Sequence, residues 1–334
     1  MKATIYDVAK EAGVSIATIS NAIHGKGKMS KERRAHILDI VDRLQYQPSM
    51  IASALTGKRT YTIGLLIPDI ANPFFAEIAR AVENRARQLG YSVIICSTDH
   101  NHERVESYIH LLLQKRIDGL VIGTGLENVE LLAPLLTEAI PVAFIARDCI
   151  SDAVHKVIVD DYLGGRLAAR HLLDRGHRRI AVLSEKHNGE RVRGFRQALE
   201  AEGLELPDEL VQTCDYRIED GKRAAANWLA HANRPTALFC CNDLSAIGAL
   251  QAARENGISV PGELSIVSFD NTLLAAVSAP SLTTIAQPIE QMGKLVIDML
   301  VKELQMSTGD KQRIVLSPEL IIRESTGMSP KNKA

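Results

Sequence analysis

The first 24 residues carry two amphipathic helical patterns separated by one glycine, and this spacing restricts what the start of the chain can form. Apolar residues recur at the spacing of one helix face (i, i+3, i+4, i+7), namely at Ile5, Val8, Ala9 and Ala12. Gly13 follows, and glycine most easily takes the positive φ angle at which many helices end. The pattern therefore predicts a short first helix that stops at Gly13.

A second short helix is predicted to begin after Ser15, whose hydroxyl can cap the free backbone N–H groups of the first turn. Its expected inward face is Ile16, Ile19 and Ile23, and small Ala9 lets the two helices cross closely. The residues left facing outward are Ala17, Thr18, Ser20 and Asn21. This arrangement predicts a helix-turn-helix, whose second helix enters the DNA major groove. An αα-hairpin in a protein core is the alternative.

The charge distribution favours the DNA interpretation. Residues 1–60 contain ten Lys or Arg and five Asp or Glu, a net charge of +5, whereas the whole chain carries −1 and the remainder therefore −6. A basic head suits contact with phosphates, and an acidic body suits solubility.

Length and composition indicate a multidomain globular protein. The chain has 334 residues, of which 46% are hydrophobic, yet it lacks the roughly 18 consecutive apolar residues of a membrane span. Charged residues interrupt the N-terminus where a signal peptide would be apolar, so we expect a cytoplasmic protein with no membrane partner. The five cysteines have no metal-ligand spacing, in keeping with a reducing compartment.

A third amphipathic helix is predicted from Ser30, and its apolar stripe is Ile37, Leu38, Val41 and Leu44. Pro48 is expected to end it, because proline disfavours helix in the preceding residue. The segment Ser49–Leu55 can form about two helical turns, which would be marginal alone in water. We therefore interpret 1–47 as the head and 48–60 as a hinge helix or linker that orders on binding.

From Tyr61 onwards, short apolar runs alternate with amphipathic helical patterns such as Phe75–Leu89 and Arg104–Leu113. The runs are Thr62–Pro68, Ser92–Cys96, Gly119–Gly123, Pro141–Ile145, Arg179–Leu183, Thr236–Cys241 and Leu264–Phe269. Continuous apolar strands with helical crossovers predict parallel sheets covered on both faces. The expected fold is an all-α head followed by a two-lobed α/β domain, with a ligand between the lobes beyond the carboxyl ends of the strands.

Ordered motifs from Thr4 to Thr326 resemble the lactose/galactose-repressor (LacI/GalR) family of bacterial transcription regulators. They include the head pattern, Arg175–Ala181, Arg193–Phe195, Pro235–Ala237, Asn242–Asp243, Ser268–Asn271, Pro280–Ile285 and Leu320–Thr326. The resemblance implies a homodimer with two DNA-binding heads and lobes like those of periplasmic sugar-binding proteins. The expected boundaries are 61–160 with 289–315 for lobe one, 161–288 with 316–326 for lobe two, and 327–334 for a tail.

By this resemblance Ile16, Ala17 and Asn21 read base edges of a pseudo-palindromic operator. Many members carry arginine where this chain has Asn21, and asparagine pairs better with adenine than with guanine. Leu55 resembles the leucine that wedges into a central base step from the minor groove. The further candidate DNA contacts are Thr4, Tyr6, Ser15, Thr18, Ser20, His24, Ser30 and Ala52.

Polar residues that follow predicted strands form the candidate effector site, joined by two residues that the resemblance adds, Arg191 and Tyr216. The strand-end candidates are Asp69, Asn72, Phe74, Arg147, Asn242 and Asp270. Such side chains suit a small polar ligand: sugar-like, nucleobase-like or a phosphorylated metabolite. Asp243 is expected to cap the helix that follows it. Ala146 stands where many members have aspartate, so the ligand cannot be transferred from one relative.

The chain has no nucleophile elbow, Walker loop or HExxH motif, so catalysis and cofactors are not indicated. Asp99–Glu103 contains two histidines, but we expect a polar loop with a helix cap there and no metal. Solute binding for a transporter is a less favoured function. Control by a corepressor protein stays open beside control by a small molecule, and inducer and corepressor remain equal alternatives for the effector.

Overall fold

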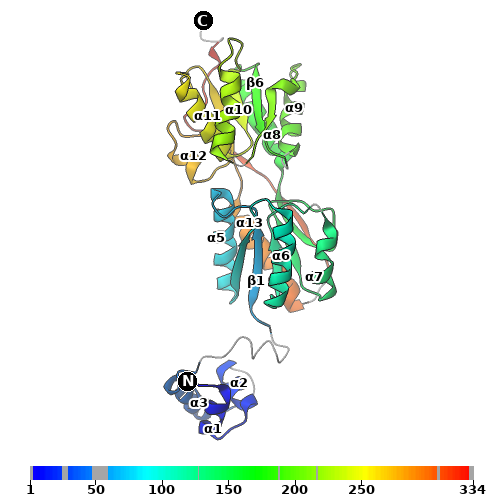
Figure 1. Ribbon diagram of the computed structural model, residues 1–334, viewed down its shortest axis with the longest axis vertical. Helices are drawn as coiled ribbons and strands as arrows, with labels where there is room; N and C mark the ends of the chain where they lie inside the picture. The colour runs from blue at the N-terminus through cyan, green and yellow to red at the C-terminus, as the bar shows by residue number, and fades with distance from the viewer. Residues whose placement is uncertain are drawn as a thin grey trace. The chain divides into compact units, whose positions relative to one another are not determined.

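The computed structural model describes residues 3–24, 29–46, 59–126, 128–186, 189–215, 217–306 and 309–330, with only the backbone for His24. The chain divides into two compact units, Met1–Thr60 and Tyr61–Ala334 (Figure 1). Within the described ranges, no helix has the length and apolar character to cross a bilayer.

The first unit contains the three predicted helices, α1 (Ile5–Ala12), α2 (Ile16–His24) and α3 (Lys31–Arg43). The stop after α1 is confirmed, because Gly13 has φ 61° and its N–H donates to the carbonyl of Ala9. The predicted Ser15 cap is also confirmed, and Ser30, where the third helix was predicted to begin, caps α3 in the same way. The Ser15 hydroxyl accepts from the N–H of Thr18 at 3.2 Å, and the Ser30 hydroxyl accepts from the N–H of Arg33 at 3.2 Å.

The core of this unit differs from the predicted faces at two positions. Ile16 was expected inside but is 37% exposed, and Ala22, one turn after buried Ile19, takes the inward place. In α3, Ile37 and Val41 are buried as predicted, but Ile40 is buried in place of Leu38, which is half-buried. Ile16 opens α2, where no preceding turn covers it, and the three-helix core closes around the middle of that helix.

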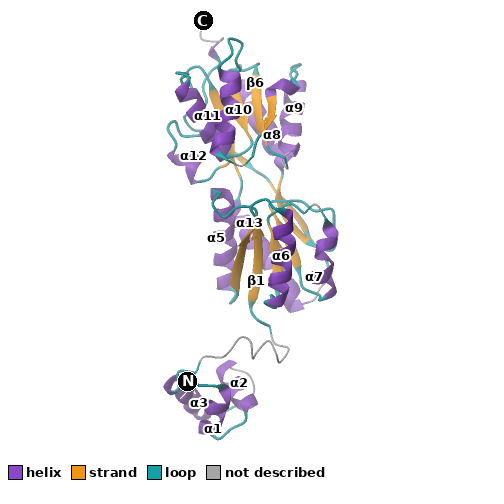
Figure 2. Cartoon of the chain, in the orientation of Figure 1, coloured by secondary structure: helices purple, strands orange, loops and turns teal. Residues whose placement is uncertain are grey.

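The second unit contains two six-stranded sheets, each with its own helices (Figure 2). Lobe one is built on the strand order β11-β5-β4-β3-β1-β2, with all neighbours parallel. Its strands are β1 (Thr62–Ile67), β2 (Ser92–Ser97), β3 (Gly119–Ile122), β4 (Val142–Ile145), β5 (His155–Val159) and β11 (Arg313–Leu316). Its helices are α5 (Pro73–Gln88), α6 (His102–Gln114), η1 (Val129–Leu132), α7 (Ala133–Thr137) and α13 (Ile289–Met306).

Side-chain alternation along β1 assigns these helices to two faces. Ile63, Leu65 and Ile67 pack with α5 and α13, whereas Leu66 packs with α6 and α7. The buried helices on both sides explain why β1 is an uninterrupted apolar run. Lobe one is therefore the predicted doubly covered parallel sheet.

Lobe two repeats this arrangement with the order β12-β10-β9-β8-β6-β7, in which β12 alone runs antiparallel, against β10. Its strands are β6 (Ile180–Ser184), β7 (Val211–Thr213), β8 (Ala237–Cys240), β9 (Ser265–Asp270), β10 (Thr283–Ala286) and β12 (Glu319–Ile321). Its helices are α8 (Asp161–Asp174), α9 (Gly189–Glu200), η2 (Asp208–Leu210), α10 (Ile218–Leu229), α11 (Asp243–Glu255) and α12 (Leu273–Val277). In both lobes the order in which strands join the sheet reverses between the first and third strands, β1/β3 and β6/β8, and ligands bind at such a point in open α/β sheets.

The end of the described chain belongs to lobe two. Gly327 donates its N–H to the Ser265 hydroxyl at 3.0 Å, and its carbonyl bonds the ring of His177 at 3.1 Å. Ser329 is buried and donates its N–H to the carbonyl of Arg175 at 2.8 Å. The packed part of lobe two thus extends past residue 326, the predicted end.

Candidate functional site

The surface of α2 presents the residues that the sequence singled out for base contacts. Ala17 and Asn21 are exposed, Ile16 is 37% exposed, and Thr18 and Ser20 are half-buried. Ile19 anchors the opposite side of the helix in the core. The helix can therefore offer an amide and two apolar side chains to a DNA groove without unpacking the head.

The start of α1 is held by a reciprocal cap. The N–H and the hydroxyl of Thr4 both donate to the carboxylate of Asp7, at 2.8 and 2.7 Å, and these bonds lower the pKa of Asp7. Tyr6, in the first turn of α1, is 70% exposed. Thr4 is therefore engaged in the cap, whereas the Tyr6 ring is available to a partner.

Four candidates cannot be placed by side chain. Ala52, Leu55 and Tyr216 lie outside the described residues, as does the side chain of His24. The linker at 48–60 falls in the same category up to residue 58.

In lobe two the candidates Arg191, Asn242 and Asp270 come together at the carboxyl ends of the strands. Arg191 is 6% exposed, and its Nε donates to Asp161 at 2.7 Å. Its NH1 donates to the carbonyl of Cys241, the residue before Asn242, and lies 3.7 Å from the Asp270 carboxylate. The guanidinium also stacks on a ring, that of Phe269, with 3.6 Å to the ring centroid.

The charges of this cluster are set by burial and by each other. Burial opposes the charge of Arg191, but the carboxylates of Asp161, Asp270 and Glu185 outweigh it and raise the Arg191 pKa. Burial raises the pKa of Asp270 well above its ordinary value, and the pull of Arg191 only partly opposes this. Asp161 is the nearer partner of Arg191, so we assign the ion pair to it. Asp270, held by the amide of Gln287 at 2.7 Å, is a carboxyl that can exchange hydrogen bonds with a ligand.

The predicted cap by Asp243 is wrong, and its neighbour supplies the cap instead. The Asn242 Oδ1 accepts from the N–H of Ser245 at 2.6 Å, at the start of α11. The Asp243 carboxylate accepts from Ser268 (2.6 Å) and from both the N–H and the hydroxyl of Thr272 (2.7 and 2.8 Å). Asp243 is 2% exposed, and a carboxylate so deeply buried needs several hydrogen-bond donors, which Ser268 and Thr272 supply.

The Oδ1 atom of Asn242 is used for the cap, and the Nδ2 atom of the same amide is not. Asn242 is 3% exposed, and its Nδ2 donates no hydrogen bond to any residue that the structure describes. A buried donor of this kind costs free energy unless a ligand or water accepts from it. The residue before Asn242, Cys241, accepts from Arg191, which lies 3.7 Å from Asp270, and this makes lobe two the better-defined half of a ligand site.

In lobe one the candidates follow β1 and β4, two strands separated in the sheet by β3. Asp69 accepts from the N–H of Ala71 at 2.8 Å, and Asn72 caps α5 by accepting from Phe74 at 3.0 Å. Phe74 is 6% exposed and packs edge-on against Phe75, so it offers a ligand far less surface than a stacking wall would. Arg147 is half-buried after β4.

His100 belongs to this group and was missed as a site residue. Burial and the charge of Arg147 lower its pKa, while Asp69 of the same lobe and Asp215 of lobe two act in the opposite direction. The sequence marked its loop only as a polar segment before a helix, and Asn101 does cap α6 by accepting from Glu103 at 2.8 Å. The topology, which sequence alone did not supply, places this loop beside β1 at the strand ends.

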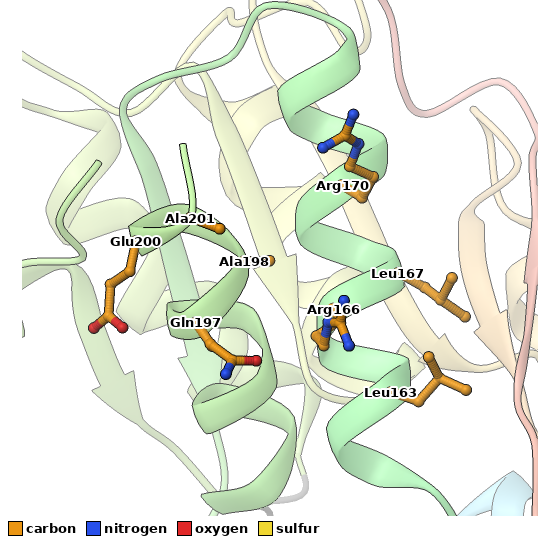
Figure 3. Close-up of a pocket in the computed structure, with 8 residues that line it drawn as sticks. All are labelled: Leu163, Arg166, Leu167, Arg170, Gln197, Ala198, Glu200 and Ala201. Carbon is orange, nitrogen blue, oxygen red and sulfur yellow. The ribbon is translucent and has the colours of Figure 1, made fainter. Parts of the chain in front are cut away.

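Two cavities of the described chain differ in whether candidate residues line them. A cavity of about 540 Å³ at the crossovers between the lobes has Arg147 and Asp161 in its wall, with Glu190, Arg193 and Arg313. A groove of about 730 Å³ runs between α8 and α9 (Figure 3) and contains none of the candidate residues. Of these two, the first is compatible with the predicted ligand site, because Arg147 lies in its wall.

Comparisons with known proteins agree with this architecture. The pattern of bacterial regulatory proteins of the lacI family matches residues 4–49, and that of a periplasmic binding protein-like domain matches 169–326. The HTH-type transcriptional regulator DegA of Bacillus subtilis (strain 168) is 43% identical, covering 99% of this chain and 100% of its own. A Lac repressor dimer bound to operator and the anti-inducer ONPF matches with a TM-score of 0.88 at 27% identity, covering 98% of this chain and all of the other. A complex of the transcriptional regulator CelR with cellobiose matches with a TM-score of 0.73 at 29% identity, covering 97% and 99%.

Proposed function

This chain belongs to the lacI family of bacterial regulatory proteins, and we propose that it is a sequence-specific, operator-binding repressor controlled by a small polar effector held between lobes one and two. The head would bind DNA and the strand ends would bind the effector. Relatives named as transcription regulators over their full length support this assignment and give no support to an enzyme.

The exposed face of α2 carries the DNA half of the proposal. Asn21 has an amide that can pair with adenine N6 and N7 in the major groove, and Ala17 can contact a thymine methyl. The basic charge of the first 60 residues adds affinity that does not depend on sequence. The head would therefore prefer an A·T pair where arginine-bearing relatives prefer G·C.

The unsatisfied donor of Asn242 carries the effector half. Together with the Asp270 carboxyl it offers one donor and one acceptor to a ligand with hydroxyl or ring nitrogen groups. Arg191 is already paired with Asp161, so it would orient these groups and stack on Phe269 more than neutralise an anion. The arrangement favours a neutral polar effector over a phosphorylated one.

A homodimer fits the apolar residues left on the surface of both lobes. The edge strand β2 and helix α6 expose Ile95 and Leu111 at 38 and 39%, and α12 exposes Leu273 and Val277 at 68 and 64%. An exposed apolar edge strand is a liability unless a second chain covers it. Two heads held in this way would recognise two inverted half-sites.

Selection of bound sites from random duplexes tests the DNA half. Full-length protein at a stated salt concentration should enrich an inverted repeat, with adenine favoured at one position of each half-site. Failure to enrich any motif, in the presence or absence of a metabolite extract, would overturn the assignment.

The enriched duplex then serves as the probe for the effector. A named panel of neutral sugars, nucleobases and sugar phosphates is titrated into the complex, and a neutral member should change operator affinity. A response that requires a protein fraction would favour the alternative of a corepressor protein. A groove of about 500 Å³ between α5 and α13, with Arg80, Glu290 and Lys294 in its wall, offers a charged surface for that alternative.

A further inference from the structure

We propose that Glu77 is a positioning residue that fixes lobe one against α12 of lobe two and carries the state of the effector site to lobe one. The proposal rests on the proposed function, because operator binding is one of its measured outcomes. It concerns a residue of α5 that lies outside the candidate effector and DNA-binding sets.

The contact itself joins the two lobes. The N–H of Leu273, the first residue of α12, donates to Oε1 of Glu77 on α5 at 3.3 Å. Figure 1 shows α12 on the side of lobe two next to α5. The bond uses the backbone of Leu273, so the exposed leucine side chain stays available to another surface.

Glu77 bonds a backbone N–H although two cationic side chains, Arg80 and Lys294, line the same groove. Arg80 lies three residues on along the same helix, yet Glu77 accepts a hydrogen bond from a backbone N–H of the other lobe. Burial raises the pKa of Glu77, and the bond from Leu273 opposes that rise. The carboxylate is therefore partly withdrawn from water toward α12.

A short chain of bonds links this contact to the candidate effector site. Asp243 follows Asn242 and accepts from both the N–H and the hydroxyl of Thr272, at 2.7 and 2.8 Å. Thr272 directly precedes Leu273. Asp243 and Thr272 are 2 and 3% exposed, so this brace is internal and rigid. A ligand that shifts Asn242 would shift Asp243, Thr272 and the N–H that Glu77 holds.

Loss of this contact has a defined consequence. Without it, lobe one would sample more orientations relative to lobe two, and the fraction of molecules competent for operator binding would fall. The apparent operator affinity falls by the same fraction. The net loss of one ordinary hydrogen bond corresponds to a change of about threefold to tenfold.

Three variants test the contact, with operator affinity measured by fluorescence anisotropy on the selected duplex. Glu77→Ala should weaken binding about threefold to tenfold, and Glu77→Gln, which keeps Oε1 as an acceptor, should stay within about twofold of wild type. Glu83→Ala is the matched control, because Glu83 pairs with Arg87 within α5 at 3.4 Å and, among the described residues, makes no ion pair with lobe two. Unchanged or tighter binding by Glu77→Ala, or equal loss in Glu77→Gln, would overturn the proposal.

Amide hydrogen exchange separates this inference from the proposed function. In the free protein, Glu77→Ala should speed exchange of the Leu273 amide severalfold while leaving the amides of β9 unchanged. Equal exchange rates in variant and wild type would overturn the contact whether or not the protein binds an operator. Absence of operator binding by the wild type, with the exchange effect present, would instead contradict the proposed function.

A double-mutant cycle tests the transmission step. Thr272→Val removes the hydroxyl bond to Asp243 and retains the shape of the side chain. Its effect on operator affinity should largely disappear in the Glu77→Ala background, because both changes act on one element. Additive losses would show that Thr272 and Glu77 act independently and would overturn the transmission.

Discussion

Asn242 and Asp243 show, at the scale of single residues, how neighbours in sequence take opposite tasks. Both follow β8 and both can cap a helix, so sequence alone assigned the cap to the aspartate. The structure gives the cap to Asn242 and uses Asp243 to brace the loop before α12. The choice depends on which residue is enclosed by Ser268 and Thr272, and those partners lie 25 and 29 residues away.

The amide of Asn242 leads to a test of the effector site. Asn242→Ser keeps a residue that caps helices well but removes the buried Nδ2, so unfolding free energy should change by less than about 1 kcal/mol. Affinity for the effector found in the panel should fall about tenfold, the value of one lost hydrogen bond. Melting temperature and effector titration measure the two effects, and full effector affinity in a stable variant would exclude Asn242 from the site.

His171 makes stability depend on pH. Burial, with the charge of Arg175 adding to it, lowers the His171 pKa to about 4, whereas the unfolded chain titrates near 6.5. The unfolded state therefore binds more protons between these values, so stability is complete above pH 6.5 and falls as pH drops toward 4. The total loss is about 3 kcal/mol.

Thermal unfolding followed from pH 7 to 5 checks this dependence. His171→Gln should flatten the decline because glutamine does not titrate, and His177, whose pKa is also lowered by burial, should leave a smaller slope. An identical slope in variant and wild type would rule out His171 as the cause.

At the scale of elements, the α8–α9 pair depends on contacts that only glycine allows. A Cβ atom on Gly165 would lie 1.9 Å from the carbonyl oxygen of Arg191, and one on Gly194 would lie 2.0 Å from that of Tyr162. The two helices therefore touch backbone to backbone, and this crossing sets the position of Arg191 in the effector site.

Gly165→Ala should consequently destabilise lobe two by about 3 kcal/mol or more, since backbone cannot move aside as a flexible side chain can. Gly189→Ala is the control, because a Cβ at Gly189, the first residue of α9, meets nothing within 4 Å. Denaturant unfolding of both variants compares them, and equal stability would mean that the helices can separate at little cost.

The strands show how far sequence reaches at this scale. All seven predicted runs are strands; six of them are buried on both faces, as continuous apolar character indicates, whereas β2 is a partly exposed edge strand. The five missed strands, β5, β7, β10, β11 and β12, are short or mixed in composition; β10 is Thr-Thr-Ile-Ala, and its neighbours in the sheet determine its conformation. Missing β10 also hid Gln287, which follows it and holds Asp270.

For the whole molecule, family motifs and helix patterns predicted the head, the two-lobed fold and the regulator class, and the comparisons confirm these. The site was predictable only as strand-end residues on each lobe. Asn72 caps a helix and Phe74 is buried in the core. Packing between elements distant in sequence decides which candidates take such structural roles and which stay open to a ligand.

Asn21 is expected to determine which base the whole protein prefers at one position of each half-site. Asn21→Arg should move the preference at one position of each half-site from adenine to guanine, because arginine bonds guanine O6 and N7 with two hydrogen bonds. The discrimination changes by about 1–3 kcal/mol at that position and by little elsewhere. Repeating the duplex selection with the variant measures the shift, and an unchanged motif would mean that Asn21 does not contact a base.

The central claim, that one chain couples operator and effector, is tested most directly by reciprocal titration. Effector affinity is measured by calorimetry with and without the selected operator, and operator affinity with and without the effector. Linkage requires both affinities to change by the same factor, and we predict a common factor of about 5 to 150. Effector binding that is equally tight in the presence and absence of operator would contradict the account.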